Sequence, residues 1–104
     1  MKGQFDETAR IVSRGGGLEV TGPAVWDPDE SGAVIHVRVK QDHVVATGVS
    51  AYTPSSAATW SARLTTRSGT LEPGVAEAKA RAEVSLKNGH SEPYSWPDTV
   101  ELVA

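Results

Sequence analysis

The sequence has 104 residues, 38% of them hydrophobic, with a formal net charge of -3 and no cysteine. A chain of this length predicts one domain, residues 1–104, whose core buries roughly two thirds of the unfolded surface. Without cysteine there is no disulfide, no thiolate metal site and no cysteine nucleophile. The small, dispersed negative charge argues against a nucleic-acid partner.

The N-terminal segment, MKGQFDETAR, contains no apolar run. We therefore expect neither a signal peptide nor a transmembrane helix, and no membrane partner. Residues 1–7 are expected to be flexible. The compartment stays open, cytoplasmic for the sequence as it stands and secreted if it is a trimmed mature form.

Turn signals recur along the chain at residues 14–17, 27–32, 41–43, 52–56, 67–74 and 87–90. Between them apolar and polar residues alternate, which is the period of a half-buried strand. The pattern predicts strands at 8–13, 17–22, 33–40, 43–50, 58–66, 75–87 and 91–103. Seven short strands in a chain of this size are typical of an all-β, antiparallel immunoglobulin-like sandwich.

Residues 33–51, AVIHVRVKQDHVVATGVSA, predict a β-hairpin. With a two-residue loop at positions 41 and 42, Lys40 would lie opposite His43, and Val39 opposite Val44. A register slip of one residue would expose the apolar face, so the register matters. That face would hold Ile35, Val37, Val39, Val44, Ala46 and Gly48.

Residues 74–86, GVAEAKARAEVSL, combine helix-forming residue types with an apolar residue at every second position. In a helix these apolar side chains would scatter around the cylinder, whereas in a strand they form one face. The period therefore predicts a strand with a face made largely of alanine. Such small side chains need a large neighbour, for which Trp60 is the candidate, or a closely apposed second chain.

The flanks of this segment support the strand. Pro73 and Gly74 suit a type II turn before it, and Asn88 and Gly89 form a strong hairpin signal behind it. The strand at 75–87 should therefore pair with 91–103. Two prolines at 93 and 97 place the first half of that last strand at an edge or a bulge.

The second half of the chain contains several short motifs in a fixed order. Trp60 is followed by Gly69, then by LEPG at 71–74, then by the alternating alanines of 76–82. This combination resembles small bacterial immunoglobulin-like domains of uncharacterised proteins. The resemblance implies the fold and no activity. Members of that group are often exported and carry a cysteine pair, which this chain lacks.

Histidine and basic residues alternate along the predicted hairpin. In the predicted register the side chains of His36 and His43 point outward but lie roughly 13 Å apart, too far to share a metal ion. Arg38 and Lys40 lie on the same face, which would attract an anionic ligand or an acidic partner, or would simply be a solvated outer surface.

The turn WDPDES offers a second candidate site. Asp27, Asp29 and Glu30 are hard oxygen ligands of the kind that calcium prefers, but the spacing lacks the glycine and the separated carboxylates of a calcium loop. We therefore interpret the segment as an acidic turn, with calcium binding as the alternative.

The tryptophans suggest two different roles. Trp60 is in phase with its apolar neighbours, which predicts a core position between the sheets. Tyr94 and Trp96 fall on one side of an extended chain and would form, with Trp26, a stacking platform for a sugar or a peptide. Packing at the edge or end of the sandwich is the alternative.

No motif identifies an activity. The nucleophile-elbow pattern G-x-S-x-G is absent, so we expect no enzyme, no cofactor and no metal. We interpret the chain as a non-catalytic binding or assembly module that docks a protein partner or a second copy through a sheet face or edge. A domain binding a glycan or small ligand through exposed aromatics is the alternative, and a small all-β enzyme is a third candidate. The docking face would carry His36, Arg38, Lys40, Glu77, Lys79 and Arg81.

Overall fold

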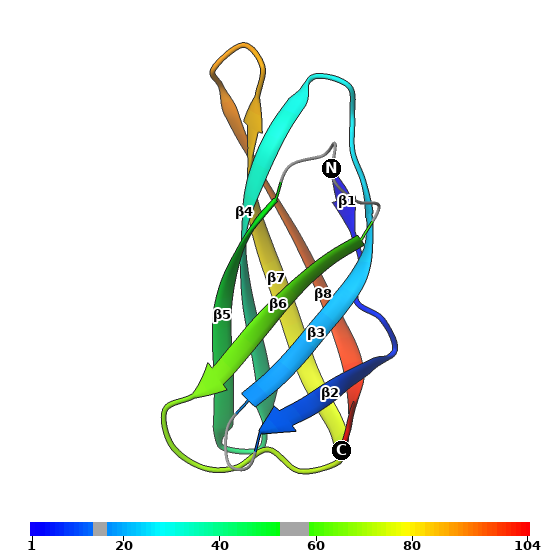
Figure 1. Ribbon diagram of the computed structural model, residues 1–104, viewed down its shortest axis with the longest axis vertical. Coiled ribbons are helices and arrows are strands. Elements are labelled where there is room, and N and C mark those ends of the chain that lie inside the picture. The colour runs from blue at the N-terminus through cyan, green and yellow to red at the C-terminus, as the bar shows by residue number, and fades with distance from the viewer. Residues whose placement is uncertain (14–16, 53–58) are drawn as a thin grey trace.

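The computed structural model describes residues 1–13, 17–52 and 59–104, and these contain strands and no helix (Figure 1). The all-β prediction is confirmed. The turns predicted at 14–17 and 52–56 fall largely outside the described residues. The strands are β1 (Lys2–Gly3), β2 (Thr8–Ser13), β3 (Gly17–Val25), β4 (Glu30–Gln41), β5 (Val44–Tyr52), β6 (Thr59–Thr66), β7 (Gly74–Leu86) and β8 (Ser91–Val103).

The strands form a single sheet that closes on itself. Its order is β1-β3-β2-β8-β7-β4-β5-β6, and β3 also pairs with β6. Figure 1 shows β3 and β6 crossing in front of β7 and β8. The predicted antiparallel sandwich is wrong in two respects. The sheet is a closed, barrel-like one rather than two separate sheets, and β2 pairs with β8 in parallel. Alternation within a strand carries no information about which distant strand it joins.

Closure requires β5 and β6 to approach closely. The two strands pair only at Ala46–Thr66 and Thr47–Thr65. Next to these pairs, a Cβ on Gly48 would collide with the backbone carbonyl of Arg63. The glycine therefore allows one backbone to pass against the other where the sheet turns its corner.

The β4–β5 hairpin differs from the prediction in its register. Gln41 pairs with Val44, and Asp42 and His43 form the loop, with a φ of 53° at Asp42. Aspartate tolerates this left-handed conformation better than most residues, which places the loop one position later than predicted. Since the pairing shifts by two residues, the inward and outward faces stay as predicted.

The long strand β7 settles the competition between helix propensity and strand period in favour of the strand. Its alanines at positions 76, 78, 80 and 82 are buried, while Glu77, Lys79 and Arg81 are exposed. The predicted β7–β8 pairing is confirmed, with Ser85 opposite Ser91. The connecting loop spans residues 87–90, and Gly89 adopts a φ of 90°.

The start of β7 differs from a type II turn. Gly74 has a φ of 142°, well beyond the value of about 80° expected at the third residue of that turn. The peptide of Glu72 is instead held by the side chain of Gln41, whose amide nitrogen donates to its carbonyl at 2.8 Å and whose oxygen accepts from its N–H at 2.9 Å.

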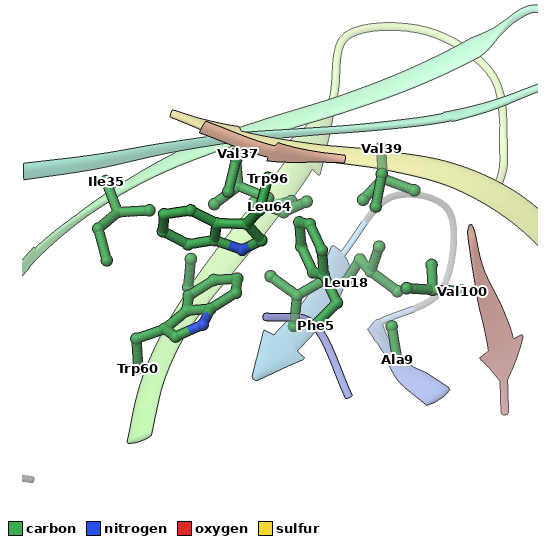
Figure 2. Close-up of a cluster of buried hydrophobic side chains, with 14 of the residues drawn as sticks. Phe5, Ala9, Leu18, Ile35, Val37, Val39, Trp60, Leu64, Trp96 and Val100 are labelled. Atoms are coloured by element: carbon green, nitrogen blue, oxygen red, sulfur yellow. The ribbon is translucent and has the colours of Figure 1, made fainter. Parts of the chain in front are cut away.

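The core centres on aromatic side chains from both sides of the barrel. Trp60, only 1% exposed, packs edge-on against Phe5 at 5.2 Å and Trp96 at 5.7 Å between ring centroids. Figure 2 shows these rings gathered among aliphatic side chains. The core position of Trp60 is confirmed. Trp96 lies opposite Ala80 in the β7–β8 register, so a large side chain other than the predicted Trp60 lies directly beside the alanine face.

Residues 1–7, for which the sequence predicts flexibility, lie against the barrel. Met1 and Phe5 are buried, and β1 pairs with the end of β3. A Cβ on Gly3 would lie 2.6 Å from the Trp96 ring, so this glycine lets the N-terminal segment cover the tryptophan. The mobility of the segment stays a prediction.

Candidate functional site

The outer face of β4 and β7 brings together the charged residues singled out in the sequence. His36 pairs with Arg81, Arg38 with Lys79, and Lys40 with Glu77, and all six side chains are exposed. The residues come from strands about forty positions apart in the sequence, joined because both bury their opposite faces in one core. We call this surface the basic face, defined by His36, Arg38, Lys40, Glu77, Lys79 and Arg81.

Most cations of the basic face lack a partner. Arg81 lies 3.8 Å from Glu83, but Arg38, Lys40 and Lys79 have no carboxylate within ion-pair distance in the described part of the chain. Arg38 and Lys79 are moreover direct cross-strand neighbours, an arrangement that costs stability because like charges repel. The chain as a whole is acidic, so this excess of positive charge is local.

The basic face is hollowed along β7. A groove of about 650 Å³ runs between its long charged side chains and the shorter Pro97, Asp98 and Thr99 of β8, so its lining includes the Asp98 carboxylate. A second depression, of about 360 Å³, lies between β4 and β5 beside His36 and Val49. Both are open to solvent and shallow, shapes suited to side chains of a partner more than to an enclosed small molecule.

Apolar side chains border the basic face on the β5 side. Val49 is 60% exposed and Val34 is 41% exposed. Val49 pairs with His36, and Val34 pairs with the exposed Ala51, so the two valines are diagonal neighbours on one surface. We call Val34, Val49 and Ala51 the valine corner. Sequence analysis missed it because the β5 residues opposite β4 depend on the register.

The two histidines of the hairpin do not share a site. His36 stands on the basic face, while His43 is in the exposed β4–β5 loop rather than on the strand as predicted. Neither imidazole makes a hydrogen bond or an ion pair within the described ranges. The arrangement places no carboxylate beside either imidazole to orient it as a general base.

The predicted aromatic platform is not assembled. Trp96 points into the core and is 8% exposed, so the expectation that it offers a stacking surface is wrong. Trp26 and Tyr94 are only partly buried and pack against the core. The predicted alternative, edge packing, describes Trp96. Its indole nitrogen is buried beneath the N-terminal segment and has no hydrogen-bond partner among residues 1–13, 17–52 and 59–104.

The hydroxyl group of Tyr94 has a raised pKa. Its hydroxyl donates to the Glu92 carboxylate at 2.8 Å, and this bond, with desolvation and the nearby negative charge, raises the pKa of Tyr94 from 10.0 to about 12. A phenol with such a pKa stays neutral at physiological pH, so it is a hydrogen-bond donor rather than a base.

The acidic turn is built around a buried carboxylate. Glu30 is 4% exposed and accepts from the Met1 ammonium group at 2.7 Å and from the Asp27 N–H at 2.6 Å. Asp27 and Asp29 are exposed. Within residues 1–13, 17–52 and 59–104, no three metal-binding side chains of the types His, Cys, Asp or Glu gather as a metal site would require. The burial of Glu30 was invisible to sequence reasoning, because its partner lies far along the chain.

The described residues include no helix that is long and apolar enough to span a membrane.

Comparison with known proteins identifies the fold and no more. No protein-family model matches the sequence, and no curated protein matches it. Among solved structures the chain is similar to murine CRIg, an immunoglobulin-like domain, with a TM-score of 0.52 and 8% sequence identity. The similarity covers 97% of this chain and 94% of that one. It supports an immunoglobulin-like all-β architecture over the whole chain.

Proposed function

We propose that the protein is a non-catalytic binding module that docks a protein partner on the basic face and the adjoining valine corner. The observation that carries the proposal is the combination of unpaired cations with exposed valines on one continuous surface of β4, β5 and β7. Protein interfaces combine an apolar centre with charged groups at the rim, and exposed apolar side chains gathered together often mark them.

The fold is consistent with this role. The immunoglobulin-like neighbour suggests binding or recognition in general terms, without naming a ligand. Membership of the small bacterial immunoglobulin-like domains, inferred from the second half of the chain, belongs to the same proposal. A rigid β-scaffold with shallow outer grooves suits recognition of a surface, since it presents fixed side chains at low entropic cost.

A comparison of two surface variants tests the proposal. Val49→Asp puts a charge into the valine corner, whereas Thr65→Asp makes a similar change at an exposed position on β6. Each protein is immobilised and used to capture a partner from native host extract, and the captured protein is then purified and titrated by calorimetry. We expect Val49→Asp to weaken binding by about tenfold or more and Thr65→Asp to leave it unchanged.

Matching thermal unfolding curves for the three proteins would show that the variants are folded. Equal binding by all three would reject the basic face and valine corner as the docking surface. Turnover of any captured small molecule by the purified protein would contradict the non-catalytic assignment.

A further inference from the structure

The charges of the basic face define the chemistry of its occupant. We propose that the occupant is an extended, acidic segment of a partner protein, with carboxylates on the unpaired cations and an aliphatic side chain on the valine corner. This inference rests on the proposed function and specifies the partner's chemistry. Arg38, Lys40 and Lys79 are the cations that have no carboxylate of their own chain within ion-pair distance in the described residues.

The geometry of the cations favours an extended segment. Arg38 and Lys79 are cross-strand neighbours, and Lys40 follows Arg38 at the next outward position of β4. Outward positions of a strand repeat every 6.5–7 Å or so, which is also the spacing of alternate side chains in an extended peptide. An acidic residue at every second position of such a peptide could therefore face successive cations, while the groove along β7 takes up its side chains.

The same surface argues against a polyanion such as a sulfated glycan or a nucleic acid. Glu77 lies opposite Lys40 at one end of the row of cations, and Asp98 lines the groove beside them, so both carboxylates would repel a regularly charged polymer. The exposed side chains of Val49 and Val34 would gain no apolar contact from such a ligand, whereas an apolar group of a partner would bury them. A peptide can place charge and aliphatic side chains independently, so it meets both conditions.

A second copy of this chain fits less well. A two-fold dimer through the basic face would bring the same surface against itself. The face carries the cations Arg38, Lys40, Lys79 and Arg81 against Glu77, with Glu83 near Arg81 and Asp98 lining the groove, so each copy would still present an excess of positive charge to the other. Light scattering at tens of micromolar protein should accordingly show a monomer, and a dimer lost in the Arg38→Glu/Lys79→Glu variant would overturn the proposal.

Selection from a random peptide library displayed on phage tests the chemistry directly. The protein is the bait, and enriched peptides are synthesised and titrated against four proteins: the original, Arg38→Glu/Lys79→Glu, Val49→Asp, and Arg10→Glu/Lys87→Glu. The last variant makes the same change in net charge at exposed positions away from the basic face. A heparin-derived oligosaccharide is titrated in parallel.

We expect enriched peptides to combine several acidic residues with an aliphatic one. Their affinity should fall by about tenfold or more in Arg38→Glu/Lys79→Glu and stay within about twofold in Arg10→Glu/Lys87→Glu, and it should weaken as salt is raised. A fifth protein, the charge-conserving variant Arg38→Lys/Lys79→Arg, is titrated as a further control and should retain most of the binding.

The outcomes separate the two proposals. Peptides that are neutral and lose affinity only in Val49→Asp would overturn the acidic segment while leaving the docking surface in place. Peptides indifferent to every variant, or no enrichment over a bait-free control, would count against both. Displacement of the peptides by the oligosaccharide at lower concentration would overturn the acidic segment in favour of a glycan.

Discussion

Two outer surfaces of the same closed sheet differ in how far their polar side chains are paired with one another. On the surface of β3 and β6, Arg63 forms an ion pair with Glu19 at 3.6 Å, and Thr21 donates to Asp6 at 2.5 Å. On the surface of β4 and β7, Arg38 and Lys79 face each other without a carboxylate partner among the described residues. We call the first surface the paired face, defined by Glu19, Thr21, Ser61 and Arg63.

The difference separates a surface whose side-chain interactions stabilise the fold from one whose side-chain interactions do not. The paired face pairs its side chains within the chain: the Ser61 hydroxyl oxygen accepts from the Tyr52 hydroxyl at 3.0 Å, and the Ser61 backbone carbonyl accepts from Ser50. The basic face retains like charges whose repulsion opposes folding. Proteins commonly retain such locally unfavourable groups where function uses them, so the contrast supports our proposal that the basic face is the docking surface.

The largest predicted effect comes from removing the contact that joins the two surfaces. Trp60 lies on β6, a strand of the paired face, and packs against Trp96 on β8, the strand that pairs with β7 of the basic face. Trp60→Ala should lower the free energy of unfolding by about 3–5 kcal/mol through lost burial and a cavity. Urea unfolding followed by circular dichroism measures the change.

Trp60→Phe is the matched control. It retains a ring against Phe5 and Trp96 but loses the hydrogen bond from the indole nitrogen to the Gln4 carbonyl at 2.8 Å. It should therefore destabilise the protein by clearly less than alanine does. Equal losses in both variants would show that the hydrogen bond, and not the packing, holds the two surfaces together.

Reversing a charge on the paired face should destabilise the protein by up to about 1 kcal/mol. Arg63→Glu removes the exposed pair with Glu19 and sets two carboxylates opposite each other. The unfolding midpoint in urea at low salt measures the loss, which should shrink as salt screens the repulsion. An unchanged midpoint at low salt would mean that the surface is not held by its charge pairing.

Reversing a charge on the basic face should have the opposite sign. Lys79→Glu converts the like-charge contact with Arg38 into an attractive one, so it should stabilise the fold by a few tenths of a kcal/mol. The neighbouring Glu77 on the same strand offsets part of the gain. The same urea experiment measures it, with Lys87→Glu in the exposed β7–β8 loop as the control. If Lys79→Glu destabilised the protein while Lys87→Glu did not, the claim that like charges on the basic face oppose folding would be wrong.

The smallest predicted effect concerns the pKa of Tyr94. This residue belongs to neither the paired face nor the basic face, so the result should leave the comparison of the two surfaces unchanged. The folded state raises the pKa of Tyr94 to about 12, chiefly because its hydroxyl donates to Glu92. This contribution to stability is present below pH 10 and is lost as the pH rises through the folded-state pKa. Titration of the phenolate absorbance should show the Tyr94 pKa moving back toward 10.0 in Glu92→Gln. An unchanged titration would assign the shift to desolvation.

Local patterns anticipated most of the strands, because side-chain alternation reports burial on one face directly. The strand at 8–13 and the strand at 91–103 match their predicted bounds, and the alanine-rich segment is a strand despite its helix propensity. The hairpin loop after β4 was placed one residue too early. Its position depends on the left-handed conformation of Asp42, which an alternating pattern does not encode.

The residues of the candidate site were likewise predictable from the sequence only in part. The charged outward residues of β4 and β7 could be named in advance, since each strand's period fixes which side chains point outward. Trp96 was misassigned, because its alternation on β8 is equally compatible with a buried and an exposed face. Its burial comes from Gly3 and the N-terminal segment, which lie more than ninety positions earlier in the chain.

The sequence by itself determined the strands, their inward and outward faces and the central role of Trp60, because these depend on residue type and on a period of two. Only the tertiary structure decided that the sheet closes, that β4 lies beside β7, and that Arg38 faces Lys79 next to an exposed valine corner. Strand partners and register are settled by how distant segments bury their apolar faces in one shared core, and that information is distributed over the whole chain.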